Sequence, residues 1–316
     1  MSGDIIRPQG PWEHTQVSAN GASFHVATAG EGPLVLLLHG FPTFWWTWRN
    51  LLPLLAEDGL RVAAMDLRGY GGSDHSPRGY DPFTTSGDVV GVIRSLGYAD
   101  AVIIGHGWGG FLGWTAAALH PDAVRGLAAV SMAHPRRLRD AIVSDRGQLR
   151  ASSYVIGFQR PWIPERALVA DDAAKIGGYL RDWSATPGWP PPDVSARFRA
   201  AFSLSNTAHC ALEYHRWALR SIPRPDGRRF VETVSQSEIT APVLQIHGAQ
   251  DRTVLPRTAV GSREFTSGPY AWRLFEDVGH FVHEETPDRF ATTVRAWLAD
   301  GMEWCDPPED DPLVPS

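Results

Sequence analysis

Residues 101–110 read Ala101-Val102-Ile103-Ile104-Gly105-His106-Gly107-Trp108-Gly109-Gly110. The apolar residues predict a short buried strand, and the glycines that follow predict a tight turn into a helix. In a nucleophile elbow, a Ser, Cys or Asp stands between small neighbours on such a strained strand-to-helix turn. Here the corresponding residue is Gly107, which has no side chain and cannot form a covalent intermediate. We therefore predict an elbow of this type with a vacant nucleophile position.

Strand and helix patterns alternate on both sides of this stretch, with short connections. The strands are expected at 17–29 as a hairpin, and at 34–38, 61–66, 101–104, 124–130, 243–247 and 271–275. The helices are expected at 44–56, 88–96, 109–119 and 287–299. This alternation predicts an α/β fold with a mostly parallel sheet of about eight strands and helices on both faces.

The alternation stops between residues 134 and 230, where Arg-rich helical patterns are interrupted by a Pro-rich run at 187–192. This segment predicts a helical lid inserted between the sixth and seventh strands. Residues 1–133 and 231–300 are then the α/β core. The Pro- and acid-rich residues 301–316 are expected to form a loosely ordered tail.

The composition is that of an ordinary globular protein. The 316 residues include 43% hydrophobic and 20% charged residues, and the net charge is −6 with the basic residues scattered, which argues against a nucleic-acid partner. The two cysteines, Cys210 and Cys305, have no metal-ligand spacing. No signal peptide or membrane span is expected, so we predict a cytoplasmic protein without a metal or organic cofactor. A homo-oligomer is left open.

Five motifs occur in the order found in one branch of the α/β-hydrolases, and the resemblance covers residues 14 to 299. They are His39-Gly40-Phe41-Pro42, Asp66-Leu67-Arg68-Gly69-Tyr70-Gly71-Gly72-Ser73-Asp74, Gly105-His106-Gly107-Trp108-Gly109-Gly110, Gly248-Ala249-Gln250-Asp251 and Gly279-His280. Together they resemble the epoxide hydrolase and haloalkane dehalogenase branch. The resemblance implies an α/β-hydrolase fold with a cap, and hydrolysis of an epoxide or ester bond.

The resemblance also implies roles for individual residues. The family's elbow reads Gly-His-Asp-Trp-Gly-Gly, with an attacking Asp where this chain has Gly107. His280 maps to the general base, and Asp251 maps to the carboxylate that orients it. The backbone N–H groups of Phe41 and Trp108 map to the oxyanion hole, which needs no particular side chain.

The ligand site is expected to draw on the lid and on the flanking histidines. Tyr154 resembles the family's first lid tyrosine, whereas His215 occupies the place of the second, with Tyr214 beside it. The tryptophans of this segment would give the lid an apolar inner face: Trp162, Trp183, Trp189 and Trp217. His39 and His106 are either extra acid–base groups or, as we favour, residues that orient the surrounding loops.

Three hypotheses about function stay open. His280 and Asp251 could activate a water without a covalent intermediate, which would make the protein a general-base enzyme. The protein could instead bind an apolar ligand without turnover. The chain could also be an epoxide hydrolase in which the nucleophilic aspartate was replaced in the laboratory by Gly107. In all three, the partner is a small hydrophobic molecule.

Overall fold

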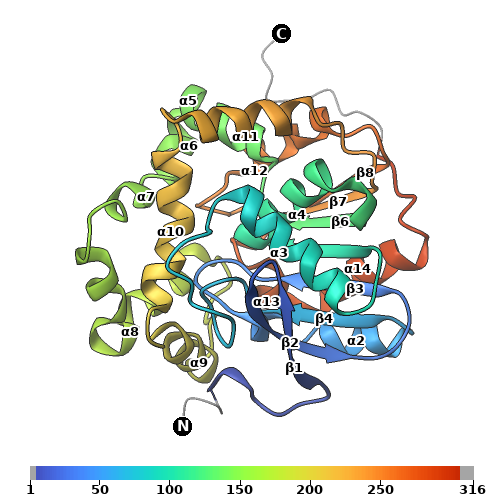
Figure 1. The fold of residues 1–316 in the computed structure, drawn as a ribbon, viewed down its shortest axis with the longest axis horizontal. Helices are drawn as coiled ribbons and strands as arrows, with labels where there is room; N and C mark the ends of the chain where they lie inside the picture. The colour runs from blue at the N-terminus through green and yellow to red at the C-terminus, as the bar shows by residue number, and fades with distance from the viewer. Residues whose placement is uncertain (1–4, 307–316) are drawn as a thin grey trace.

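The computed structural model describes residues 5–306, and these form one eight-stranded sheet with helices packed around it (Figure 1). The strand order is β1-β2-β4-β3-β5-β6-β7-β8. Their bounds are β1 (Glu13–Ala19), β2 (Ala22–Ala29), β3 (Leu34–Leu38), β4 (Arg61–Met65), β5 (Ala101–His106), β6 (Val124–Val130), β7 (Val243–Gly248) and β8 (Tyr270–Phe275). Only β2 runs against its neighbours, so the prediction of a mostly parallel sheet of eight strands is confirmed.

Helices cover both faces of this sheet. In Figure 1, α3 and α4 lie in front of the strands, while α2 and α14 lie behind them. The core helices are α2 (Leu52–Glu57), α3 (Pro82–Ser95), α4 (Trp108–Leu119), α12 (Pro256–Val260), α13 (Val282–Glu285) and α14 (Pro287–Ala299). Three short 3₁₀ helices complete this part: η1 (Trp45–Trp48), η2 (Pro121–Ala123) and η3 (Gly261–Phe265). Every residue of β3 and β5 is buried, as expected for central strands covered on both faces.

Every regular element between β6 and β7 is a helix, as the sequence predicted. This segment forms α5 (Pro135–Ser144), α6 (Arg146–Ala151), α7 (Tyr154–Gly157), α8 (Ile163–Trp183), α9 (Pro192–Phe202), α10 (Thr207–Arg220) and α11 (Pro225–Gln236). The backbone of α8 is non-helical at residues 170–173. In Figure 1 these helices gather along the left and top of the molecule, beside the sheet. Because α11 continues to Gln236, no element ends at the expected boundary after residue 230.

Two local predictions were wrong. The single helix expected over 44–56 is instead η1 followed by α2, because Pro53 stands at the start of α2 and has no N–H to continue a helix from the preceding turn. The helix expected from Asp88 begins six residues earlier at Pro82, because the side chain of Asp81 accepts a hydrogen bond from Thr84 N and caps it.

The tail is also more ordered at its start than expected. Asp306 donates its N–H to the carbonyl of Tyr270, and its carboxylate pairs with Arg273 at 2.7 Å. These contacts fasten residues 301–306 along β8, while the rest of the predicted tail, 307–316, lies outside the described residues. None of the helices within 5–306 is both long enough and apolar enough to cross a membrane.

Candidate active site

The turn between β5 and α4 has the backbone of the predicted elbow. Gly107 adopts φ 53° and ψ −119°, a left-handed region that side-chain-bearing residues rarely adopt. Its N–H donates to Val130 O at 3.0 Å, and its carbonyl accepts from Phe111 N at 2.9 Å. The turn is therefore held between the neighbouring strand β6 and the helix that follows it.

Position 107 has room for a side chain although none is present. A Cβ built on Gly107 would lie 3.5 Å from Nε2 of His280 and 3.6 Å from Cα of Gly40, which are ordinary contacts. His280 comes from the loop after β8, and its side chain is about 5% exposed. The structure thus brings the predicted base to the vacant elbow, and the space between them is open.

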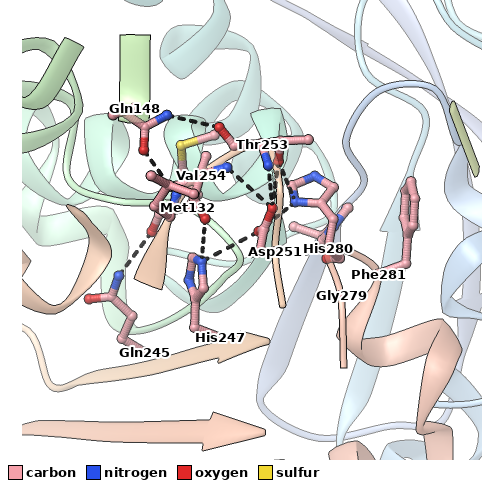
Figure 2. A network of polar contacts seen from close by, with 12 residues as sticks. Met132, Gln148, Gln245, His247, Asp251, Thr253, Val254, Gly279, His280 and Phe281 are labelled. Atoms are coloured by element: carbon pink, nitrogen blue, oxygen red, sulfur yellow. Dashed lines mark hydrogen bonds and ion pairs between the residues drawn. The ribbon is translucent and has the colours of Figure 1, made fainter. Parts of the chain in front are cut away.

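Asp251 contacts His280, the residue that the resemblance pairs with it. Its Oδ2 lies 2.8 Å from Nδ1 of His280, and because a carboxylate only accepts, Nδ1 carries the proton. Its Oδ1 accepts from Thr253 N at 2.8 Å and from Val254 N at 3.2 Å (Figure 2). Burial opposes ionisation of Asp251, but the charge of His280 and hydrogen bonds from His247 and His280 outweigh it and hold its pKa well below the usual range.

Thr253 belongs to this network and was missed from the sequence. Its Oγ1 lies 2.8 Å from Oδ1 of Asp251 and 2.8 Å from Nδ1 of His280 (Figure 2). The hydroxyl therefore donates to the carboxylate while it faces the imidazole N–H. A Thr two residues after a loop Asp carries no distinctive signal, so only the fold reveals this contact.

Gln148 of α6 was also missed. Its side chain is fully buried, and its Nε2 donates to Thr253 O at 2.9 Å while its Oε1 accepts from Leu255 N at 2.9 Å. In Figure 2 it reaches across from its helix to the loop that carries Asp251 and Thr253. This side chain therefore links the helical insertion to the loop that carries Asp251.

The two predicted oxyanion-hole amides are available. Trp108 is the first residue of α4, where a helix leaves its N–H groups without intrahelical partners. Within residues 5–306, neither Trp108 N nor Phe41 N donates a hydrogen bond to the protein. Both residues line the same cavity as Gly107 and His280.

An apolar cavity of about 200 Å³ opens above the elbow. Its wall combines residues of the sheet side with residues of the helical insertion, among them Phe111, Met132, Ile142, Leu219 and Val254. The lining contains no Asp, Glu, Lys or Arg. Such a concave, apolar site with few polar groups is typical of small-molecule binding.

Tyr154 and His215 both line this cavity, as predicted, but they differ in what they can do. Burial raises the pKa of Tyr154, so its phenol stays protonated, and its hydroxyl has no protein partner among the described residues. His215 accepts from Trp108 Nε1 at 2.9 Å and donates from Nδ1 to Ala211 O at 3.0 Å. Burial lowers the pKa of His215 to about 4, so its ring is neutral with both nitrogens occupied.

Three aromatic residues predicted for the ligand site lie elsewhere. Tyr214 points its hydroxyl to Arg68 O at 2.9 Å and is outside the cavity lining, because successive residues of a helix point about 100° apart. Trp217 packs edge-on against Phe230, with ring centroids 5.5 Å apart. Trp162 is 74% exposed and precedes α8, so it does not face inward. Of the four tryptophans proposed for the lid's inner face, Trp183 lines the cavity.

His39 and His106 are also outside the cavity lining, and both hold loops. His39 accepts from Leu67 N at 3.0 Å and contacts Gly40 O at 3.0 Å. His106 contacts the carbonyl of His280 through Nε2 at 3.0 Å, next to the predicted base. These bonds fit the loop-orienting interpretation. No cluster of three or more metal-ligating side chains occurs among residues 5–306.

Comparisons with known proteins identify the family of this fold. The family model described as "alpha/beta hydrolase fold" matches residues 33–287. Epoxide hydrolase 3 of Xenopus tropicalis is 31% identical over 90% of this chain and 77% of its own length. Epoxide hydrolase A of Mycobacterium tuberculosis is 31% identical over 91% of this chain and 97% of its own length.

A third relative is named only as a member of the α/β-hydrolase superfamily, and a solved structure of similar fold is an epoxide hydrolase. The AB hydrolase superfamily protein YfhM of Bacillus subtilis is 32% identical over 86% of this chain and 92% of its own length. The crystal structure of an epoxide hydrolase from Bacillus megaterium superposes with a TM-score of 0.80 at 26% identity, covering 90% of this chain and 100% of that one. The chain therefore belongs to the α/β-hydrolase fold family, and its relatives in that family include epoxide hydrolases.

Proposed function

We propose that this epoxide hydrolase-like protein hydrolyses a small hydrophobic epoxide or ester by general-base chemistry, with no covalent enzyme intermediate. The observation that carries the proposal is the open space between His280 and Gly107. Nε2 of His280 lies 3.5 Å from where a Cβ of residue 107 would stand, while Nδ1 is held by Asp251 at 2.8 Å. A water in that space has a base beside it and the Phe41 and Trp108 amides nearby.

The proposed chemistry transfers one proton to and from His280. The water oxygen attacks the substrate carbon while Nε2 takes its proton, and Asp251 stabilises the resulting imidazolium. With an ester, the two amides hold the oxyanion, and His280 then returns the proton to the leaving alkoxide. With an epoxide, the ring C–O bond breaks, the Tyr154 hydroxyl hydrogen-bonds to the developing alkoxide, and the proton held by His280 then returns to that oxygen. Because relatives of this chain are named epoxide hydrolases, an epoxide is the first substrate class to test.

We also propose that the helical segment, residues 134–230, acts as a lid. Its support is that the cavity is lined both by Tyr154, Trp183 and His215 of this segment and by Gly107 and His280 of the core. A ligand bound between them would be shielded from water by apolar side chains, which strengthens the interactions of its polar atoms.

The test is turnover on a panel of aryl epoxides and aryl esters. His280→Ala is expected to lower kcat/KM by about 10²-fold or more, whereas His209→Ala, which changes a half-exposed histidine, should leave the rate unchanged. In a single turnover in H₂¹⁸O, the product should carry the heavy oxygen, because no protein oxygen enters it. An unchanged rate in His280→Ala contradicts the proposal.

A second candidate function is ligand binding without turnover, and the missing side chain at Gly107 favours it. Ligand carried through purification would then be visible by native mass spectrometry, with no activity on the panel. The third alternative, a laboratory replacement at this position, has its own test. If Gly107→Asp hydrolyses aryl epoxides, the missing aspartate is the only defect; if the variant is inert, the cavity is not an epoxide site.

A further inference from the structure

We infer that the vacant position at Gly107 binds the carboxylate of an apolar monocarboxylic acid, with the rest of the ligand in the cavity above. The inference rests on the proposed function in using the same cavity, and it adds the chemical class of the ligand. An aspartate at position 107 would place a carboxylate on this turn. Where the side chain is missing, the carboxylate of a bound molecule can take the same space.

Polar groups without partners surround this space. His280 is about 5% exposed, and within the described residues its Nε2 makes no hydrogen bond. The amides of Phe41 and Trp108 also lack acceptors there. Leaving buried donors unpaired costs free energy, so an incoming acceptor with two oxygens would satisfy groups that the protein itself does not.

The local charge also favours an anion. Trp108 begins α4, a twelve-residue helix whose N-terminus carries partial positive charge. No acidic side chain lines the cavity. Asp251 lies on the far side of the imidazole, and its oxygens accept from His280, Thr253 and Val254. Its charge is thus directed away from the vacant position.

The proton balance is simple. Because Asp251 accepts the Nδ1–H, Nε2 of His280 can donate to a bound carboxylate only when it also carries a proton. A carboxylate anion brings no proton, so Nε2 takes one from solvent as the anion binds, and the carboxylate then lies beside the imidazolium. The charges of the anion and the proton cancel, so the net charge of the site stays the same.

The rest of the cavity selects an apolar chain or ring. Beyond the elbow its wall is largely aliphatic and aromatic, and it includes the partly exposed side chains of Leu149, Ile156 and Ile222. The exposed parts of these side chains mark where the cavity meets solvent. Since no basic side chain lines the wall, a second carboxylate would find no cation there. A monocarboxylate with its tail toward the opening fits this distribution.

The experiment compares octanoate with 1-octanol, which has a tail of the same length but no charge. Dissociation constants are measured by calorimetry on the full-length chain. Octanoate is expected to bind at least tenfold more tightly than 1-octanol. Affinity should also rise about fourfold for each methylene from hexanoate to octanoate, as burial of the tail requires.

Two variants locate the carboxylate. Gly107→Asp places a competing carboxylate in the space, and His280→Gln removes the group that takes the proton. Each should lower the ratio of octanoate to 1-octanol affinity by tenfold or more, and if the first does not fold, the second gives the same test. A ratio unchanged in either folded variant overturns the inference. If 1-octanol binds and octanoate does not, the inference fails and the proposed function survives; if neither binds, both fail.

Discussion

Asp251 is the residue on which the geometry of the candidate site depends most. It is buried, it holds Nδ1 of His280 at 2.8 Å, and it accepts hydrogen bonds from Thr253 N and Oγ1 as well. His247 lies 3.4 Å from the same oxygen that faces His280. A single side chain thus fixes both the tautomer of His280 and the loop that follows β7.

The pH dependence of stability should report this carboxylate. Burial opposes its ionisation, but His280 and His247 outweigh burial and lower its pKa below the ordinary value near 3.9. A carboxyl group whose pKa is lower in the folded state stabilises the fold above its unfolded pKa, and this stabilisation is lost as the pH falls through the folded value. We expect Asp251→Asn to be less stable than the parent at pH 7.

This difference should shrink as the pH falls below about 4, where the unfolded carboxyl takes up a proton. Urea unfolding of both proteins at pH 7, 5 and 3 measures it. A gap in unfolding free energy that stays constant across this range would show that the charge of Asp251 is not what stabilises the fold.

At the scale of elements, the elbow depends on the close approach of α4 to β3 and β5. A Cβ on Gly109 would overlap the backbone carbonyl of Leu38, and one on Gly105 would overlap the carbonyl of Gly109. Backbone atoms cannot move aside as a flexible side chain can. The glycines beside residue 107 are therefore required by packing, whereas Gly107 itself has room for a side chain.

Gly109→Ala is accordingly expected to lower the free energy of unfolding by about 3 kcal/mol, because the helix must shift away from the strand. The matched control is Gly157→Ala at the end of α7, where an added Cβ would meet nothing within 4 Å. That change should lie within about 0.5 kcal/mol of the parent. Thermal and urea unfolding would give both values, and equal losses in the two variants would contradict the packing argument.

At the scale of the whole molecule, Glu285 joins the helical insertion to the core. Its Oε2 accepts from Ala185 N at 2.8 Å, from Thr186 N at 3.0 Å and from Gly279 N at 3.1 Å, and its Oε1 accepts from Phe281 N at 3.0 Å. The first two amides follow α8, and the last two flank His280. This buried carboxylate therefore sets the position of the insertion relative to His280.

Glu285→Ala should lower the free energy of unfolding by about 3 kcal/mol or more, because it leaves four backbone N–H groups without an acceptor. Glu285→Gln, which keeps one oxygen, should lose less. Glu232→Ala removes an exposed glutamate of α11 and should be neutral. Urea unfolding compares the three variants, and a loss no larger in Glu285→Ala than in Glu232→Ala would rule out this role.

Much of the fold was predictable because its signals are local. The apolar runs of β3 and β5 and the glycines around residue 107 act over a few residues, so their strands and turn could be predicted from sequence. The helix expected over 44–56 failed where Pro53 interrupts it. The direction of Tyr214 could not be predicted, because it depends on how α10 docks on the core.

The sequence by itself determined the α/β alternation, the elbow and the absence of a side chain at Gly107, since each is a property of neighbouring residues. Only the tertiary structure decided that Gln148, Thr253 and Glu285 hold the loops that carry Asp251 and His280. Gln148 and Thr253 are 105 residues apart in the chain, and no local pattern marks either of them. Their hydrogen bonds form only when the helical insertion packs against the carboxyl ends of the strands, where burial makes each unpaired polar group costly.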